Sequence, residues 1–340
     1  MDKPLDRQSR FAFIVGAPRC GTTTLASFLQ QHPDVCFSVV KEPHFFSRDE
    51  VAALSGDQLL QAVEHDYWQR FFGHCPGDPQ LYAEGSVTYL YVPERIRPIL
   101  DLWPNAKFVI ALRDPLSMLP SLHARLLVTG DETIRDFPSA WAKIGERANG
   151  KSVPKRAIDP RWLRYDWAGQ LGQNVERFLA AVGRERCHII LFDDLTSDPR
   201  GTYRQLCSFL GIDPWDGTDF EPQRTNKTIR IGWLQRLMKR PPKAIRTALA
   251  GEHFHKREKE VGSNQGKTLT TIFALRKRLL DWNKVEAKRQ PLDPGVRAEI
   301  IERHRDDVIL LSKVIDRDLS HWLGGVPEAR PDFAKSAATA

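Results

Sequence analysis

The segment "FAFIVGAPRCGTTTLASFL", residues 11–29, decides which kind of fold this chain adopts. An apolar run over residues 11–15 leads into a turn that contains Gly16 and Gly21, and three threonines then open a helix-forming sequence. Glycines at this spacing let backbone N–H groups and a helix N-terminus converge on an anion. A complete nucleotide-triphosphate loop has Lys before its Ser/Thr, whereas this chain has Thr22 there. The turn is therefore predicted to bind a phosphate group that is shorter than a triphosphate or ends differently.

The rest of the N-terminal half alternates between strand-like and helix-like patterns. Continuous apolar runs at 11–15, 108–112 and 188–192 are typical of strands buried on both faces, and weaker candidates lie at 35–40 and 81–84. This alternation predicts an α/β fold with a three-layer, doubly wound, mainly parallel sheet. The P-loop spacing of Gly16 and Gly21 makes the expected fold P-loop NTPase-like. The helical patterns cover residues 22–31, 58–72, 92–102, 116–128, 168–182 and 199–210.

Strand signals stop near residue 215, so the C-terminal part is expected to be different. We predict a single domain over residues 11–325, in which 215–325 form a mostly helical extension with a helix over 294–315. The polar ends, residues 1–10 and 326–340, are expected to be flexible.

Composition is that of a soluble globular protein, with 41% hydrophobic and 27% charged residues in 340. No run reaches the roughly 18 apolar residues of a membrane span, and the N-terminus lacks the apolar core of a secretory signal, so a cytoplasmic location is expected. The isolated His253-x-His255 suggests a metal only weakly, and no metal is predicted. Five cysteines without metal-ligand spacing are expected to be free thiols in a reducing compartment. They are Cys20, Cys36, Cys75, Cys187 and Cys207.

The net charge of +7 is concentrated in one segment. Residues 239–289 hold 14 Lys/Arg and 5 Asp/Glu, so the remaining chain is slightly acidic. A solvated helical face explains this pattern most simply. The segment lacks the interleaved aromatics of single-strand binders and any DNA-reading motif, so no nucleic-acid partner is expected. Contact with a membrane surface or a polyanion stays open as an alternative.

Two further loops follow predicted strands and carry chemistry. In "KEPHFFS", residues 41–47, Glu42 could remove a proton from a hydroxyl group, and His44 could share that work or orient the acceptor. In "FVIALRDPLSMLPSLHARL", Arg113 ends a strand and Ser121 lies eight residues later. Each segment taken alone is explained equally well by a solvated turn or a surface ion pair.

Taken together, the three segments resemble the sulfotransferase family that uses 3′-phosphoadenosine 5′-phosphosulfate (PAPS). The resemblance implies that "GAPRCGTTTL" holds the 5′-phosphosulfate, that Arg113 and Ser121 bind the 3′-phosphate, and that "TNKTIR", residues 225–230, closes over the nucleotide. "KEPHFF" is similar to the segment of heparan-type sulfotransferases that carries the catalytic base. The implied catalytic residues are Glu42, Arg19 and His44. The implied PAPS-binding residues are Arg19, Cys20, Gly21, Thr22, Thr23, Thr24, Arg113, Ser121, Asn226, Lys227, Thr228 and Arg230.

The resemblance implies transfer of a sulfuryl group from PAPS to a hydroxyl acceptor, without a metal, and leaves PAP as product. Arg19 stands where many family members have Lys; since arginine does not readily release a proton, it is assigned to electrostatic stabilisation. Ser47 stands where the heparan enzymes usually carry an acidic residue. A saccharide or glycolipid acceptor is expected, with a small-molecule or lipid alcohol as the alternative. A P-loop kinase and a non-enzymatic polyanion binder are the remaining alternatives.

Overall fold

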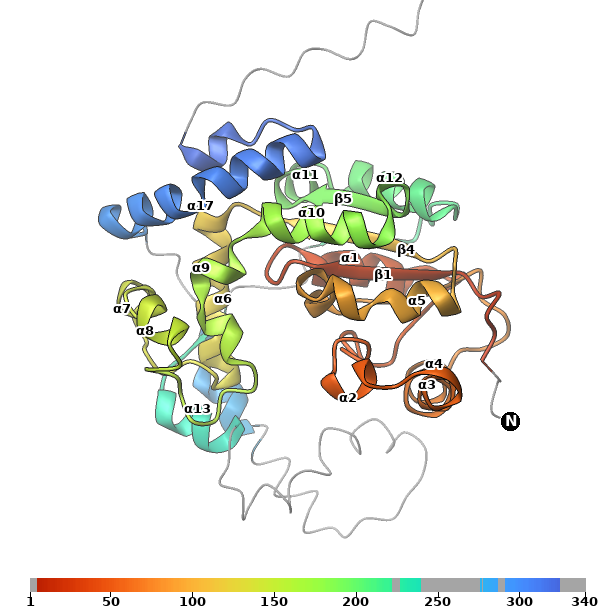
Figure 1. The fold of residues 1–340 in the computed structure, drawn as a ribbon, viewed down its shortest axis with the longest axis horizontal. Coiled ribbons are helices and arrows are strands. Elements are labelled where there is room, and N and C mark those ends of the chain that lie inside the picture. The colour runs from red at the N-terminus through yellow and green to blue at the C-terminus, as the bar shows by residue number, and fades with distance from the viewer. Residues whose placement is uncertain (1–4, 222–226, 240–275, 277, 287–290, 325–340) are drawn as a thin grey trace, which may run out of the picture. The chain divides into compact units, whose positions relative to one another are not determined.

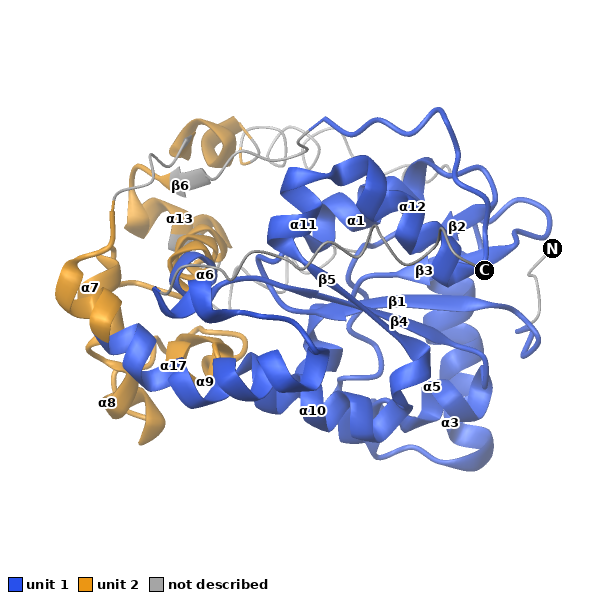
Figure 2. Cartoon of the chain, turned by 90° about the horizontal axis from the view of Figure 1, so that it is seen from above, with its two compact units in different colours: residues 1–118, 170–223, 299–340 blue, residues 119–169, 224–298 orange. Residues whose placement is uncertain are grey.

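The structure is a computed structural model that describes residues 5–221, 227–239, 276, 278–286 and 291–324. These residues form two compact units, which are interleaved along the chain and coloured separately in Figure 2. The first, unit 1, comprises 1–118, 170–223 and 299–340, and the second, unit 2, comprises 119–169 and 224–298. The expected single domain with flexible ends stays a prediction.

Unit 1 contains a five-stranded parallel sheet in the order β2-β3-β1-β4-β5. The central strand β1 pairs with β3 on one side and β4 on the other, with Ala12 opposite Ala83 and Phe13 opposite Phe108. All six residues of β1 are buried, as the continuous apolar run predicts. The five strands are β1 Phe11–Gly16, β2 Val35–Phe37, β3 Leu81–Glu84, β4 Lys107–Leu112 and β5 Cys187–Leu191.

Helices cover both faces of this sheet, which confirms the doubly wound α/β architecture (Figures 1 and 2). Helices α1 and α12 share one face, where Phe28 and Tyr203 lie with ring centroids 5.7 Å apart. Helices α5 and α10 cover the other, where Phe178 packs edge-on against Phe108 of β4. Such aromatic pairs favour edge-to-face contact. The longer helices of unit 1 are α1 Thr22–Gln31, α3 Gly56–Ala62, α5 Arg97–Leu102, α10 Leu171–Val182, α11 Phe192–Ser197 and α12 Pro199–Leu210.

Shorter helical segments fill the connections, and two helices belong partly to each unit. α6 Pro115–Thr129 and α17 Pro294–Ile315 contain the unit boundaries. Further helices among the described residues are α2 Asp49–Ala52, α4 Arg70–Phe72, α7 Phe137–Trp141, α8 Ile144–Ala148, α9 Tyr165–Ala168 and α13 Gly232–Lys239. The π-helix η1 spans Val63–Gln69, and the 3₁₀ segments are η2 Val87–Tyr91, η3 Pro93–Arg95, η4 Pro160–Leu163, η5 Arg184–Arg186 and η6 Ser320–Leu323.

Unit 2 is held internally by a buried polar cluster. Arg147 and Glu132 form an ion pair 2.8 Å long with both side chains fully buried, and the Tyr165 hydroxyl donates to Glu132. A buried pair of this kind is tolerated only when its remaining donors and acceptors are also satisfied. Arg147 meets this condition by donating to the Leu163 carbonyl as well.

The sequence shows no strand signal beyond residue 215, but β6 Lys227–Ile229 pairs there antiparallel with β7 Lys284–Glu286. The mostly helical character expected for 215–325 stays a prediction. The expectation of five free thiols is wrong, since Cys36 and Cys75 form a disulfide with Cα atoms 5.8 Å apart. Their separation of 39 residues is closed by the connection from β2 through α4 back to β3, which cysteine spacing alone does not reveal.

This disulfide is expected to contribute to stability. Because the cross-link removes conformational freedom from the unfolded chain, reduction in the presence of a chelator should lower the free energy of unfolding by about 2–4 kcal/mol. Chemical denaturation of oxidised and reduced protein measures the difference. Cys75→Ser should match the reduced wild type and show no further loss on reduction. An equal stability of oxidised and reduced wild type would contradict this prediction.

Candidate active site

The turn between β1 and α1 has the backbone geometry of an anion cradle. Arg19 and Gly21 both have positive φ, 68° and 88°. Gly21 precedes α1 and provides no side-chain cap. The Thr24 N–H donates to the Gly21 carbonyl oxygen at 2.9 Å, so the N–H groups of Thr22 and Thr23 are the ones at the helix start that suit an anion. A Cβ at Gly21 would lie 2.5 Å from Leu195, and one at Gly16 would lie 2.3 Å from Leu90. Both glycines are therefore required by close packing, and the predicted binding of a phosphate group by this turn stays a prediction.

Arg113 lies against this turn. Its Nη1 donates to the carbonyl oxygen of Arg19 at 3.3 Å, and its guanidinium stacks 4.1 Å above the ring of Phe192. The side chain is buried because β4 neighbours β1 in the sheet, which brings the end of β4 beside the loop. The structure thus joins the first and third predicted segments. Stacking on an aromatic ring fixes the plane of a guanidinium and directs its N–H groups.

The segment after β2 brings Glu42 and His44 together. Nε2 of His44 lies 3.4 Å from Oε2 of Glu42, and the two side chains are 35% and 36% exposed. Ser47 donates to the His44 carbonyl and Thr88 donates to Ser47, which leaves Thr88 to accept from Nδ1 of His44 at 2.9 Å. This assignment follows from the hydrogen-bond network. It leaves Nε2 as the nitrogen that faces Glu42, and Nε2 donates a hydrogen bond to that carboxylate only when both ring nitrogens carry a proton.

Lys41 connects the two loops and was not among the predicted site residues. Its Nζ donates to Oγ1 of Thr22 at 3.2 Å and to Oε1 of Glu42 at 2.7 Å. Thr22 occupies the position of the missing loop lysine, so a lysine from another strand end places its charge beside the vacated position. Sequence offered only its place directly after a strand as a signal, because contact across two loops depends on strand order.

The surroundings of Glu42 keep it ionised. Burial raises its pKa, but the hydrogen bond from His44 and the charge of Lys41 outweigh burial and lower the pKa to about 2. Glu42 is therefore a carboxylate at neutral pH. A clamped carboxylate of this kind is a weak base, since proton-transfer efficiency follows basicity.

Beneath this array lies a second carboxyl group, Glu84 at the end of β3. It is fully buried and accepts hydrogen bonds from the hydroxyl groups of Tyr67, Tyr89 and Ser86. Ser86 in turn accepts from the backbone N–H of His44 at 2.8 Å. Burial raises the pKa of Glu84 to about 6 despite these donors. Because His44 has a positive φ of 53°, this anchor holds a backbone conformation that the residue does not favour by itself.

A model of the sulfotransferase family matches residues 12–217, more than half of the chain. This chain belongs to the sulfotransferase family. It is 24% identical over 233 residues to protein-tyrosine sulfotransferase A of Caenorhabditis elegans, covering 63% of this chain and 53% of that protein. It is 26% identical over 201 residues to mouse heparan sulfate glucosamine 3-O-sulfotransferase 6, covering 59% and 52%. The chain thus spans about half the length of these curated relatives.

Among solved structures, a sulfotransferase from Alicyclobacillus acidocaldarius has the same fold. It superposes with a TM-score of 0.59 at 25% identity and covers 95% of this chain and 99% of its own. This sulfotransferase-family chain therefore shares the fold of that protein. No helix among the described residues has both the length and the apolar content needed to cross a membrane.

The structure gives the location of several predicted site residues, whose binding roles stay predictions. Thr22 is buried, whereas Thr23 and Thr24 are half-buried in the first turn of α1. Burial raises the pKa of the Cys20 thiol to about 12, which is consistent with a small filler in the loop. Ser121 lies in α6 within unit 2, and its predicted role toward a phosphate stays a prediction.

The predicted nucleotide-covering segment is only partly described. Asn226 and most of the basic segment 239–289 lie outside the described residues. The backbone of Lys227 and Thr228 forms strand β6 and not a loop, because it pairs with β7. Arg230 is exposed, and its guanidinium lies 5.3 Å from the ring centroid of Trp282.

The buried Glu84 makes stability depend on pH. Its folded pKa of about 6 exceeds the ordinary value of 4.5, so between these values the folded state holds the proton more tightly than the unfolded state. Stability contributed by this group is therefore present below about pH 4.5 and lost as pH rises through 6. Relative to Glu84→Gln, the wild type should lose about 2 kcal/mol over this range. Chemical denaturation at several pH values measures the difference, with the exposed Glu302→Gln as control. A pH-independent difference would contradict the prediction.

Proposed function

We propose that this chain transfers a sulfuryl group from PAPS to the hydroxyl group of a saccharide or glycolipid. The observation that carries the proposal is the continuous array from the anion cradle through Lys41 to Glu42, since Lys41 contacts both Thr22 and Glu42. Such a transfer needs two parts: a cradle that binds the anionic donor, and a carboxylate that accepts the proton of the acceptor hydroxyl group. Family membership and the sequence similarity to the heparan sulfate enzyme named above support the saccharide acceptor.

The residues present fit the 5′-phosphosulfate end of PAPS. The turn over residues 17–21 and the first turn of α1 would hold it through backbone N–H groups, with hydroxyl donors from Thr22 and Thr23. Arg19 would add positive charge, and Arg113 and Ser121 are proposed to bind the 3′-phosphate. When bound, PAPS supplies the electrophilic sulfuryl group and a phosphate leaving group.

Glu42 is proposed to accept the proton of the attacking hydroxyl. Because its pKa of about 2 makes it a weak base, it accepts that proton only as the hydroxyl oxygen bonds to its target and becomes acidic. His44 orients the carboxylate through its Nε2 contact. Lys41 is proposed to have two roles. It holds Glu42 ionised, and it places positive charge at the cradle, where negative charge develops on the phosphate leaving group during transfer. No metal is required for these roles.

A transfer assay tests the function itself. Radiolabelled PAPS is offered with a panel of glycans, glycolipids, lipid and small-molecule alcohols, and tyrosine peptides, the last because of the tyrosine sulfotransferase relative. Label should pass to saccharide acceptors, and PAP should raise the melting temperature more than ATP with Mg²⁺. Transfer only to tyrosine or simple alcohols would exclude the saccharide acceptor. Stabilisation by ATP–Mg²⁺ alone, with phosphate transfer, would favour a kinase.

Variants of the linked pair test the mechanism. Glu42→Gln should abolish turnover while PAP affinity stays within a few-fold, because the amide keeps the shape but cannot accept the proton. Lys41→Met should lower kcat by about 10- to 1000-fold, and Lys41→Arg should recover part of it, since the positive charge is restored. The acidic limb of the kcat/KM profile of Lys41→Met should also lie at higher pH than that of the wild type, because Glu42 loses the charge that lowers its pKa. The exposed Lys155→Met serves as control. Turnover by Glu42→Gln at the wild-type rate would remove Glu42 from the role of base.

A further inference from the structure

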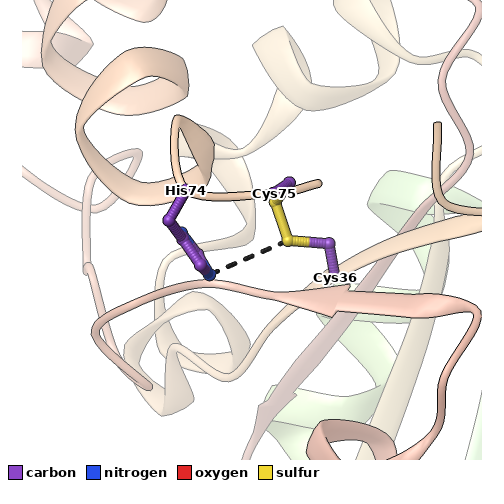
Figure 3. Close-up of side chains that lie close together, drawn as sticks. All are labelled: Cys36, His74 and Cys75. Carbon is purple, nitrogen blue, oxygen red and sulfur yellow. Dashed lines mark hydrogen bonds between the residues drawn. A yellow bond between two sulfur atoms is a disulfide. The ribbon is translucent and has the colours of Figure 1, made fainter. Parts of the chain in front are cut away.

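A second cluster of reactive side chains lies away from the anion cradle. Cys36 is on β2, and His74 and Cys75 are in the turn that follows α4. Figure 3 shows the His74 ring directed at the sulfur of Cys36, with Nε2 and Sγ 3.9 Å apart. One ligand atom from each of the three residues lies within 4.8 Å of the other two. Two sulfurs and one imidazole nitrogen are the donors that zinc prefers.

The spacing of these atoms is close to that of a zinc site. With Zn–S of about 2.3 Å and Zn–N of about 2.0 Å, a tetrahedral ion separates its sulfur and nitrogen ligands by ~3.5 Å. The observed 3.9 Å between Nε2 and Sγ is near this value. The Cα atoms of the two cysteines are 5.8 Å apart. A disulfide holds its sulfurs about 2.0 Å apart and a tetrahedral zinc ion holds two thiolates about 3.8 Å apart, so the sulfurs need to separate by about 2 Å to bind an ion instead of each other.

The two sides of the cluster differ in exposure. Cys36 is buried on a strand, whereas Cys75 is half-buried and His74 is exposed. Backbone hydrogen bonds hold both sides, with Ser38 N–H donating to Ala83 and Cys75 N–H donating to Phe72. One ligand therefore sits on rigid structure, and the other two sit in an anchored turn that solvent and an ion can reach.

We propose that Cys36, His74 and Cys75 form a zinc site when the disulfide is reduced. A thiol or phosphine reductant supplies two electrons and breaks the S–S bond, which yields two thiols and the oxidised reductant. Zn²⁺ then binds both sulfurs as thiolates and Nε2 of His74, and two protons are released to solvent. Water completes the fourth position, since three protein ligands leave one open. The inference is independent of the proposed sulfuryl transfer.

Such a site fastens the same two elements as the disulfide. β2 leads directly into the segment that holds Lys41 and Glu42. The carbonyl oxygen of Lys41 in this segment accepts a hydrogen bond from the backbone N–H of Gly85. An ion that joins β2 to the turn after α4 keeps this strand attached under reducing conditions. Because zinc binds the folded site and not the dispersed ligands of the unfolded chain, it stabilises the fold.

Metal binding by the reduced full chain tests the proposal. Protein reduced with a phosphine and freed of reductant is titrated with Zn²⁺ against a chromophoric chelator, and with Co²⁺ to detect thiolate charge-transfer absorption. About one ion per chain should bind, and Zn²⁺ should raise the melting temperature of the reduced protein. The oxidised wild type, which needs no substitution, should bind none at this site.

Variants assign the ligands. His74→Ala should weaken zinc affinity about tenfold or more, and Cys75→Ser should abolish the thiolate absorption at this site. Cys207→Ser and the double change His253→Ala with His255→Ala are the matched controls, and both should bind like the wild type. The proposal is overturned if the reduced wild type binds no ion, if His74→Ala binds as tightly as the wild type, or if the His253/His255 change removes the binding.

Discussion

The parallel pairing of the main sheet is the constraint on which the candidate site depends. Since β1, β2, β3 and β4 run in one direction, their carboxyl ends meet at one edge. Ligands of open α/β sheets bind at this edge. The anion turn after β1, the Lys41–His44 segment after β2, Glu84 at the end of β3 and Arg113 after β4 meet there for this reason. No local interaction between neighbouring residues would gather them.

Within the site, the lysine that lies beside the turn comes from a different loop than in a triphosphate-binding site. A triphosphate-binding loop carries its lysine before the Ser/Thr, but here Thr22 takes that position and Lys41 reaches it from the next strand end. Because the same ammonium also pairs with Glu42, it is shared between the Thr22 hydroxyl and a carboxylate. A lysine held in the loop itself would not have this second contact. Lys41 therefore links the first residue of α1 to the Glu42 carboxylate by direct contact.

The two carboxyl groups of the site have opposite environments. Glu42 is half-exposed beside a cation and an imidazole, and its pKa falls to about 2. Glu84 is surrounded by hydroxyl groups in the core, and burial raises its pKa to about 6. The first environment suits a group that must remain ionised, and the second suits a structural acceptor. Through Ser86, Glu84 holds the backbone of His44, so the buried group supports the exposed one.

The sequence by itself determined the layered α/β fold, the glycine turn between β1 and α1 and the position of Glu42 after β2, because these depend on local patterns. A continuous apolar run reads as a buried strand, and glycine at positive φ is a requirement of the turn itself. Tertiary structure alone decided that Lys41 contacts Thr22, that Glu84 supports His44, that Cys36 pairs with Cys75, and that β6 pairs with β7. Each of these contacts joins residues well separated along the chain. Their proximity follows from strand order and chain crossover, which short-range patterns do not encode.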